Sequence, residues 1–195
     1  MVNKKKVFKA KVIKPLLLDL GCGQNKQPDH VGVDLYAPSS DIKANLFAFP
    51  FRSAPNCAPL WKDNTVDGIF CSHFVEHIPH HLRWPFFEEC YRIMKLEAVM
   101  RIFVPSWKSE RAYGDMTHEW PAVTAMFFYY LSRNWREANK LTYGPYDIKA
   151  NFEFQCGPTG INPAFADRNQ EAQVFACTHH LEAFPDMWVN LTKKA

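Results

Sequence analysis

Two carboxylates and a glycine turn near the start of the chain have the types and spacing of a nucleoside site. Asp19 precedes Gly21-Cys22-Gly23, and Asp34 follows a short apolar run at 31–33. Glycines let the backbone turn sharply and let a ligand approach it closely. An acid at the end of a strand can accept hydrogen bonds from the two hydroxyls of a ribose. The pattern therefore predicts a ligand that contains a nucleoside.

The spacing of these residues excludes two familiar nucleotide sites. The NAD fingerprint is G-x-G-x-x-G with an acid about 20 residues further on, but here Lys26 occupies the position of the third glycine. Asp34 follows Gly23 by only half of that interval, so a helix between the two strands has room for a turn or two. A phosphate-binding loop of the form G-x-x-x-x-G-K-[ST] does not occur in the sequence.

Three histidines are candidates for a general base, because imidazole titrates near neutral pH. His73 follows the apolar run at 66–71 and is expected at the carboxyl end of a strand, beside the glycine turn. His118 has Asp115 and Glu119 nearby in sequence to orient it, and His77 is the third candidate. We take His73 and His118 as the catalytic residues. The histidines and cysteines lack the spacing of a zinc site, so no metal is expected.

The elements that position these residues alternate between strands and helices, which predicts an α/β fold. Apolar runs predict strands at 16–20, 31–33, 41–44, 66–71, 100–104, 152–156 and 187–191. Hydrophobic periodicity predicts helices at 74–78, 83–94, 121–136 and 167–180, with Asp167 as the capping residue of the last one. Because residues 95–98 lack a glycine turn, the helix at 83–94 is expected to continue for one more turn.

The length of 195 residues suits a single domain, with residues 1–14 as a basic N-terminal arm and 107–141 as a helical elaboration near the substrate. A net charge of +3 is too small to indicate nucleic acid or a membrane as a partner. The cysteines form no C-x-x-C pairs, which is typical of a reduced, cytoplasmic protein. The longest apolar run is far shorter than the roughly 20 residues that span a bilayer, and no signal peptide is expected.

Five regions of the sequence, in order, resemble the class I S-adenosylmethionine (SAM) dependent methyltransferases. They are LLLDLGCG, VGVDLY, ANLFAFPF, TVDGIFCSHFVEHI and FFEECYRIMK with MRIFVPSW. The resemblance covers residues 16–107 and is closest to the small single-domain type 11 group, which has a shortened first helix. It implies SAM as the cofactor. It also implies a Rossmann-like, mostly parallel sheet of seven strands, with helices on both faces and the last strand antiparallel.

The resemblance further implies which residues bind the cofactor. The glycine turn would hold the methionine end, Asp34 the ribose, and the loop at 45–46 the adenine. The complete set is Asp19, Gly21, Cys22, Gly23, Asp34, Leu35, Asn45, Leu46 and Ser72. Two positions depart from the family pattern: Asn45 replaces an aspartate, and residues 95–98 lack a proline-glycine-glycine turn.

Three functions are compatible with these residues. The preferred one is transfer of a methyl group to an oxygen of a small molecule or glycan, with a histidine base. The alternative is a non-catalytic SAM-binding or scaffold protein, which the two departures favour and the intact glycine turn opposes. A nucleic-acid methyltransferase is the weakest, because the sequence has no D-P-P-Y or N-P-P-Y tetrad and no cysteine after a proline.

Overall fold

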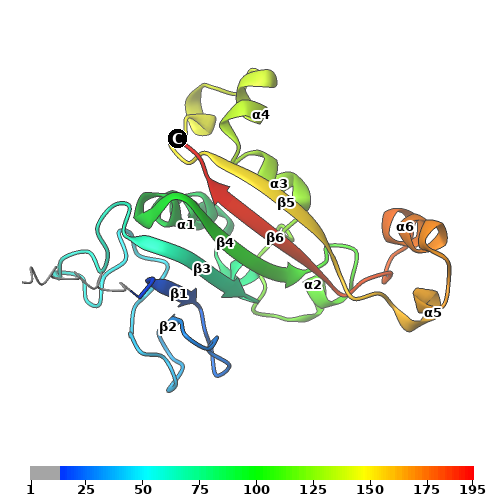
Figure 1. Ribbon diagram of the computed structural model, residues 1–195, viewed down its shortest axis with the longest axis horizontal. Coiled ribbons are helices and arrows are strands. Elements are labelled where there is room, and N and C mark those ends of the chain that lie inside the picture. Colours follow the sequence, from blue (N-terminus) through cyan, green and yellow to red (C-terminus); the bar gives the residue numbers. More distant parts are fainter. Residues whose placement is uncertain (1–13) are drawn as a thin grey trace, which may run out of the picture.

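The computed structural model describes residues 14–195 (Figure 1), so the predicted N-terminal arm lies outside the described residues except for Lys14. Six strands form one sheet in the order β2-β1-β3-β4-β6-β5. They are β1 (Leu17–Leu20), β2 (Val31–Val33), β3 (Val66–Ser72), β4 (Met94–Pro105), β5 (Phe152–Thr159) and β6 (Asp186–Lys193). The first four are parallel, and β6 lies antiparallel between β4 and β5. The antiparallel insertion of the final strand is therefore confirmed.

Most of the helices are short, and α1 is the longest of those that the structure describes. They are η1 (Val75–His77), α1 (His80–Ile93), α2 (Arg111–Gly114), α3 (Ala125–Tyr129), α4 (Arg133–Ala138), η2 (Gly144–Tyr146), α5 (Pro163–Ala166) and α6 (Gln170–His179). In Figure 1, α1 lies behind the sheet, α3 and α4 lie near β5, and α5 and α6 lie beyond the end of β5. The arrangement is an α/β fold built on a mixed sheet.

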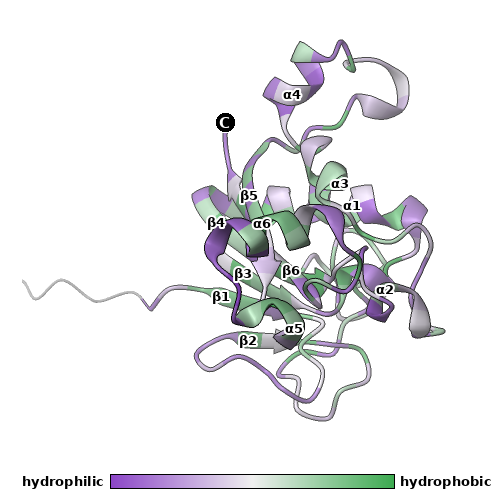
Figure 2. Cartoon of the chain, turned by 90° about the vertical axis from the view of Figure 1, so that its right-hand side faces the viewer, coloured by the Kyte–Doolittle hydropathy of each residue, from purple (hydrophilic) through white to green (hydrophobic). Residues whose placement is uncertain are grey.

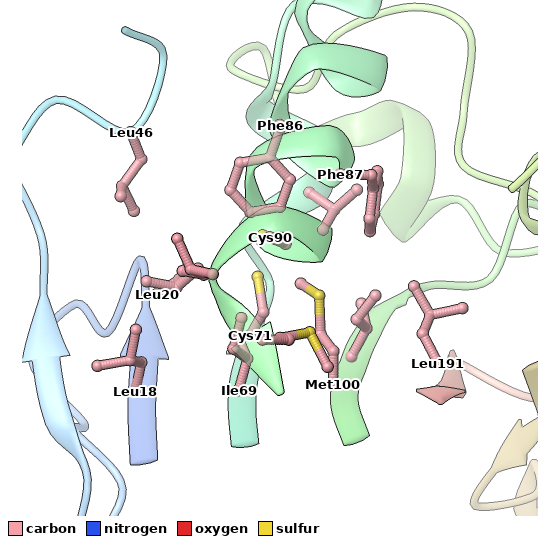
Figure 3. Close-up of a cluster of buried hydrophobic side chains, with 14 of the residues drawn as sticks. Leu18, Leu20, Leu46, Ile69, Cys71, Phe86, Phe87, Cys90, Met100 and Leu191 are labelled. Carbon is pink, nitrogen blue, oxygen red and sulfur yellow. The ribbon is translucent and has the colours of Figure 1, made fainter. Parts of the chain in front are cut away.

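The hydrophobic core fills the space between α1 and one face of the sheet. Alternate residues of neighbouring strands point to this face, and Figure 3 shows Leu18, Ile69 and Met100 in one row beneath α1. Phe86 and Phe87 from α1 cover them, and all of these side chains except Ile69 are completely buried. Burial of each such side chain contributes roughly 1.5–3 kcal/mol. This packing fixes the strands whose carboxyl ends carry the candidate site.

The predicted third strand at 41–44 is reduced to a single parallel bridge between Val33 and Ile42, so residues 14–195 form a sheet of six strands where seven were expected. The reason lies in Asp41, whose carboxylate accepts the N–H of Gly32 at 2.7 Å. A longer strand would offer a backbone carbonyl to that N–H. The segment still occupies the edge of the sheet next to β2.

The prediction of helices on both faces is also wrong for residues 14–195. The connections from β1 to β2 and from β2 to β3 contain no helix among the described residues. Figure 1 shows the sheet in front of α1, with no described helix over the front of β3 and β4. Proline and turn residues crowd the second connection, at 47–63, which removes the donors and the regular backbone that a helix needs.

The turn between α1 and β4 forms without glycine, which corrects the prediction that α1 continues past residue 94. The helix ends at Ile93, and Met94 is already extended and pairs with Val66. The register then jumps, because the next pair is Gly68 with Val99. Glu97 lies within β4 at this irregularity and has a φ of +63°, a left-handed conformation that a non-glycine residue adopts only at a cost.

Two further helices differ from their predicted bounds. The expected helix at 121–136 is divided into α3 and α4, because the side chain of Ser132 accepts the N–H of Trp135 and caps a new helix there. The helix α6 begins at Gln170 with Asn169 as its cap, since the amide oxygen of Asn169 accepts the N–H of Ala172 at 2.9 Å. Asp167 is therefore not the capping residue.

Hydrophobic and hydrophilic segments are clearly divided in space. Figure 2 shows that α4, at one extreme of the molecule, is mostly hydrophilic, whereas hydrophobic stretches lie in the strands and in parts of α1 and α6. Among residues 14–195, no helix combines the length and the hydrophobicity required to cross a lipid bilayer.

Candidate functional site

The glycine turn follows β1 at the carboxyl edge of the sheet. Gly21 and Gly23 have φ values of +68° and +51°, the left-handed region that glycine enters without a steric penalty. The N–H of Gly21 donates to the carbonyl of Val33 at 2.8 Å. A Cβ on Gly21 would lie 2.3 Å from the Phe74 ring, whereas a Cβ on Gly23 would meet no atom within 4 Å. Packing therefore requires Gly21, and Gly23 borders open space.

Asp34 is joined directly to this turn by its carboxylate. One oxygen accepts the N–H of Gly23 at 3.1 Å, and the other accepts the N–H groups of Tyr36 and Ala37 at 2.7 and 2.8 Å. Partial burial raises the pKa of this carboxyl, but the N–H donors of Ala37, Tyr36 and Gly23 outweigh it, so the pKa lies below its ordinary value. Asp34 is therefore ionised and fixed in orientation at neutral pH.

Asp19 is the second carboxylate of the turn and is only 2% exposed. Its Oδ2 accepts the N–H of Gln27 at 2.8 Å, while burial raises the pKa of the carboxyl. Burial and the nearby carboxylates, first Asp19 and then Asp34, raise the pKa of the Cys22 thiol to about 11. Cys22 is thus a neutral, buried thiol and not a nucleophile.

An open cavity of about 770 Å³ adjoins the carboxyl end of β3 and contains both of the predicted bases. One wall comes from the connection between β3 and α1, and the other from the segment around α2. The residues with polar side chains that line it are His73, Glu76, His77, Glu110, Arg111, Asp115 and His118. The structure therefore brings together residues that lie more than forty positions apart.

His73 is the more accessible of the two predicted bases, with a side chain that is 40% exposed. Its Nδ1 lies 3.2 Å from Oε1 of Glu76, and its Nε2 lies 3.9 Å from Oδ2 of Asp186. The hydrogen bond to Glu76 raises the pKa of the imidazole, against the opposing effect of partial burial. The backbone φ of +50° is uncommon for a residue other than glycine. A bond from its N–H to the carbonyl of Phe103 at 2.9 Å holds that conformation.

His118 is buried deeper, with a side chain that is 10% exposed. Its Nδ1 lies 3.3 Å from the carbonyl of Ala112, and its Nε2 lies 3.8 Å from Oδ2 of Asp115. The ring of His77 is only 4.8 Å away, centroid to centroid. Asp115 is thus placed beside His118 as expected, whereas the described contacts of Glu119 with this region run through its backbone.

Comparisons with known proteins bear on the fold. No protein-family model and no curated protein matches the sequence. Among solved structures, a SAM-dependent methyltransferase from Archaeoglobus fulgidus superimposes with a TM-score of 0.62 at 19% identity, covering 92% of this chain and 86% of that chain. The YcgJ protein of Bacillus subtilis gives 0.52 at 12% identity, covering 93% of each chain. A putative methyltransferase in complex with the Haloferax volcanii Trm112 methyltransferase activator gives 0.50 at 14%, covering 93% and 83%.

The chain has a methyltransferase fold. Within this fold, the turn with Asp19, Gly21, Cys22 and Gly23 lies at the carboxyl edge of the sheet, together with Asp34. Ligands of open α/β sheets bind in the crevice at this edge.

The other predicted cofactor residues of the methyltransferase fold differ in how far their side chains are exposed. Leu35 is 41% exposed beside Asp34, and Ser72 is half-buried at the end of β3. The side chain of Asn45 accepts the N–H of Phe47 at 2.9 Å. Leu46 is 4% exposed and belongs to the hydrophobic core, so only its backbone can face a ligand at this edge.

Two aromatic rings connect the glycine turn to the loop that contains Asn45. Phe47 stacks on Phe74 with a centroid distance of 5.8 Å, and the same Phe74 ring lies against Gly21. Phe74 directly follows His73, which lines the cavity, so one short segment contacts the glycine turn and contributes to the cavity wall.

Sequence reasoning missed Glu76, Asp186 and Arg83. The sequence predicts no role for Glu76, but this residue is 5% exposed and contacts His73. Arg83 is 3% exposed and donates to three backbone carbonyls, two of which lie in the segment after α2. The spacing of three residues between His73 and Glu76 was an available signal, while the contacts of Asp186 and Arg83 depend on distant parts of the chain.

Proposed function

We propose that this chain is a SAM-dependent methyltransferase of the type 11 group that methylates an oxygen of a small molecule or glycan. The observation that carries the proposal is the hydrogen bond between the N–H of Gly23 and the carboxylate of Asp34, at 3.1 Å. It holds the glycine turn and the ribose-binding acid side by side at the edge where α/β folds bind ligands.

The residues at this edge fit the cofactor. Open space adjoins Gly23, which leaves room for a ligand close to the backbone. Oδ1 of Asp19 accepts no hydrogen bond from the residues that the structure describes, so it is available to the ammonium group. The carboxylate of Asp34 has about four acceptor sites, and its backbone partners use three of them, so one site on Oδ2 remains for a ribose hydroxyl.

SAM, when bound, supplies a methyl group that its sulfonium already activates. The chain then has to orient the acceptor and remove its proton, and orientation alone contributes several kcal/mol. His73 is the better base, because it is accessible from the cavity and Glu76 holds its ring at 3.2 Å. His118 is the second candidate, with Asp115 beside it.

The cavity supports a small polar acceptor over nucleic acid. Its volume of about 770 Å³ lies within the range of small-molecule sites, and imidazole, carboxylate and guanidinium groups line it.

All six cysteines are unpaired, which supports a reducing compartment such as the cytoplasm.

A non-catalytic role is the second candidate, and one observation favours it. The ring of Phe74, which stacks on Phe47, lies against Gly21, so a side chain of the protein itself occupies the space beside the turn. A scaffold protein of this fold would show no binding of SAM or of its demethylated product.

Calorimetry with purified protein and SAM tests the proposal. We expect saturable binding that Asp34→Ala weakens about 10- to 100-fold, because bonds to a charged group contribute about 1.5–3 kcal/mol. Asp167→Ala is the matched control, since Asp167 is exposed and makes no side-chain hydrogen bond or ion pair with the described residues. Circular dichroism checks that each variant is folded.

If neither SAM nor its demethylated product binds to the wild-type protein, the methyltransferase proposal is wrong and the scaffold function replaces it. Where binding holds, a screen of acceptors with radiolabelled SAM follows. His73→Gln should then abolish most of the methyl transfer while it leaves SAM affinity unchanged.

A further inference from the structure

The cavity contains a compact group of one carboxylate and two imidazoles. Glu76, His77 and His118 each offer one ligand atom, and these three atoms lie within 4.8 Å of one another. Their separation is small enough for a single cation to contact all three after modest side-chain rotation. Carboxylate oxygen and imidazole nitrogen are common ligands of divalent transition metals.

Glu76 gives a second, independent indication of a ligand. The residue is 5% exposed, and its Oε2 is buried without a hydrogen-bond partner among the described residues. Its other oxygen already contacts Nδ1 of His73. A buried carboxylate oxygen without a partner is unfavourable, and a cation bound at this position would satisfy it.

The two histidines are oriented as metal ligands usually are. Nδ1 of His118 lies 3.3 Å from the carbonyl of Ala112, and Nδ1 of His77 lies 3.2 Å from the carbonyl of Thr117. A ligand histidine typically donates its second ring N–H to a carbonyl or carboxylate, which fixes the tautomer and leaves the other nitrogen for the metal. Here that other nitrogen is Nε2 in both rings.

The backbone holds the three residues together although they come from two segments. Glu76 and His77 are adjacent in η1, and His118 lies after α2. The N–H of Glu119 donates to the carbonyl of Glu76 at 2.8 Å, and the guanidinium of Arg83 donates to the carbonyl of Glu119 at 2.9 Å. The ligand atoms are therefore positioned by fixed backbone contacts.

We propose that Glu76, His77 and His118 bind one divalent first-row transition-metal ion. Two imidazoles make Mg²⁺ and Ca²⁺ poor candidates, because these ions prefer oxygen ligands. Three protein ligands leave coordination positions open toward the cavity, which is the arrangement of catalytic and not of structural metal sites. If the proposed methyl transfer holds, an acceptor oxygen would occupy an open position and become easier to deprotonate. Metal binding itself does not depend on that function.

The test is a titration of chelator-treated full-length protein with Co²⁺, followed by visible absorption and calorimetry. We expect one Co²⁺ per chain, with a dissociation constant tighter than about 100 μM. Glu76→Gln and His118→Ala should each weaken Co²⁺ binding by at least about tenfold, since the loss of an outer partner alone costs 10- to 100-fold. His81→Ala is the matched control, because His81 is exposed near the cluster in sequence and offers no ligand to it.

If the wild-type protein binds no Co²⁺ in this concentration range, the proposal is wrong, and this result does not depend on any variant. Binding that Glu76→Gln and His118→Ala leave unchanged also overturns it, because the metal then binds elsewhere. The titration contains no SAM, so its failure is separate from a failure of the methyltransferase proposal. The absorption bands of bound Co²⁺ additionally report whether nitrogen and oxygen ligands surround the ion.

Discussion

Asp34 has a structural role that does not depend on any ligand. Its two oxygens accept three backbone N–H groups, from Gly23, Tyr36 and Ala37. These bonds close both the glycine turn and the loop after β2. They also favour the charged form, so the pKa of Asp34 is lower in the folded chain than its ordinary value of 3.8. Folding stability is therefore linked to the ionisation of this one carboxyl.

Replacing Asp34 by asparagine tests this linkage. A carboxyl with a lowered pKa contributes stability that is present above pH 3.8 and is lost as the pH falls through the folded-state pKa. We expect Asp34→Asn to reduce the free energy of unfolding by about 1.5–3 kcal/mol at pH 7, and the difference from wild type to shrink below pH 3.8. Urea unfolding at several pH values measures it, with Asp167→Asn as the control. A difference that does not change with pH would contradict the linkage.

At the scale of elements, the irregular first part of β4 departs from the usual preference for glycine at a positive φ. Glu97 has a φ of +63° where glycine would be the relaxed choice. Lys95 forms an ion pair with Asp67 at 2.6 Å, and Lys194 forms one with Glu97 at 2.8 Å. These exposed pairs contribute little, so the strain is retained because Val66, Met94 and Val99 are fixed in the sheet on either side.

The strain predicts a stabilising substitution. Glu97→Gly should be more stable than Glu97→Gln by about 1 kcal/mol, because the left-handed conformation costs a non-glycine residue about 1–2 kcal/mol and glycine loses part of that gain in the unfolded chain. Both variants remove the ion pair with Lys194, so their difference isolates the backbone. Thermal or urea unfolding measures it. Equal stability of the two variants would show that the backbone at Glu97 is not strained.

At the scale of the molecule, one buried lysine ties the last strand to the first long helix. Lys193, at the end of β6, is 6% exposed. Its ammonium group donates to the carbonyls of Tyr91 and Met94 at 2.7 and 2.9 Å, and to the side chain of Asn64 at 2.7 Å. These acceptors belong to α1, the start of β4 and the turn before β3. Lys193 thereby joins the C-terminal strand to α1, to β4 and to the turn before β3.

Removing that group should destabilise the whole domain. We expect Lys193→Met to lower the free energy of unfolding by about 2–3 kcal/mol, because each buried acceptor left without a donor costs about 1–3 kcal/mol. Lys194→Met is the matched control at the next position, since its ion pairs are exposed and contribute less than about 1 kcal/mol. Chemical unfolding measures both variants. If both variants lower the free energy of unfolding equally, the proposed role of Lys193 in stabilising the contact between β6 and α1 is wrong.

The sequence predicted most strands because each depends on a local pattern. The strands predicted at 16–20, 31–33 and 66–71 match β1, β2 and β3 to within one residue, and the spacing of the acid and glycines that follow them indicates the ligand site. The predictions were wrong where contacts between residues far apart in the chain determine the local structure. The strand at 41–44 is limited by the hydrogen bond from Gly32 to Asp41, and the irregular backbone at Glu97 is held by the strand pairs on either side of it.

The candidate site shows the same division. The types and spacing of Asp19, Gly21, Gly23 and Asp34 identified the carboxyl edge before any coordinates, because residues next to a strand end are placed by that strand. His73 and His118 were chosen individually as bases. Their common cavity, and the buried Glu76 between His73 and the other histidines, depend on the path of the segment after β4.

The sequence alone determined the alternation of strands and helices, the glycine turn and the acid that follows β2, because period and spacing act over a few residues. Only the tertiary structure decided which edge of the sheet stays open, how many strands pair, and which side chains from the 72–78 and 111–118 segments meet. Those outcomes depend on hydrogen bonds and burial between residues far apart in the chain, and no local pattern encodes them.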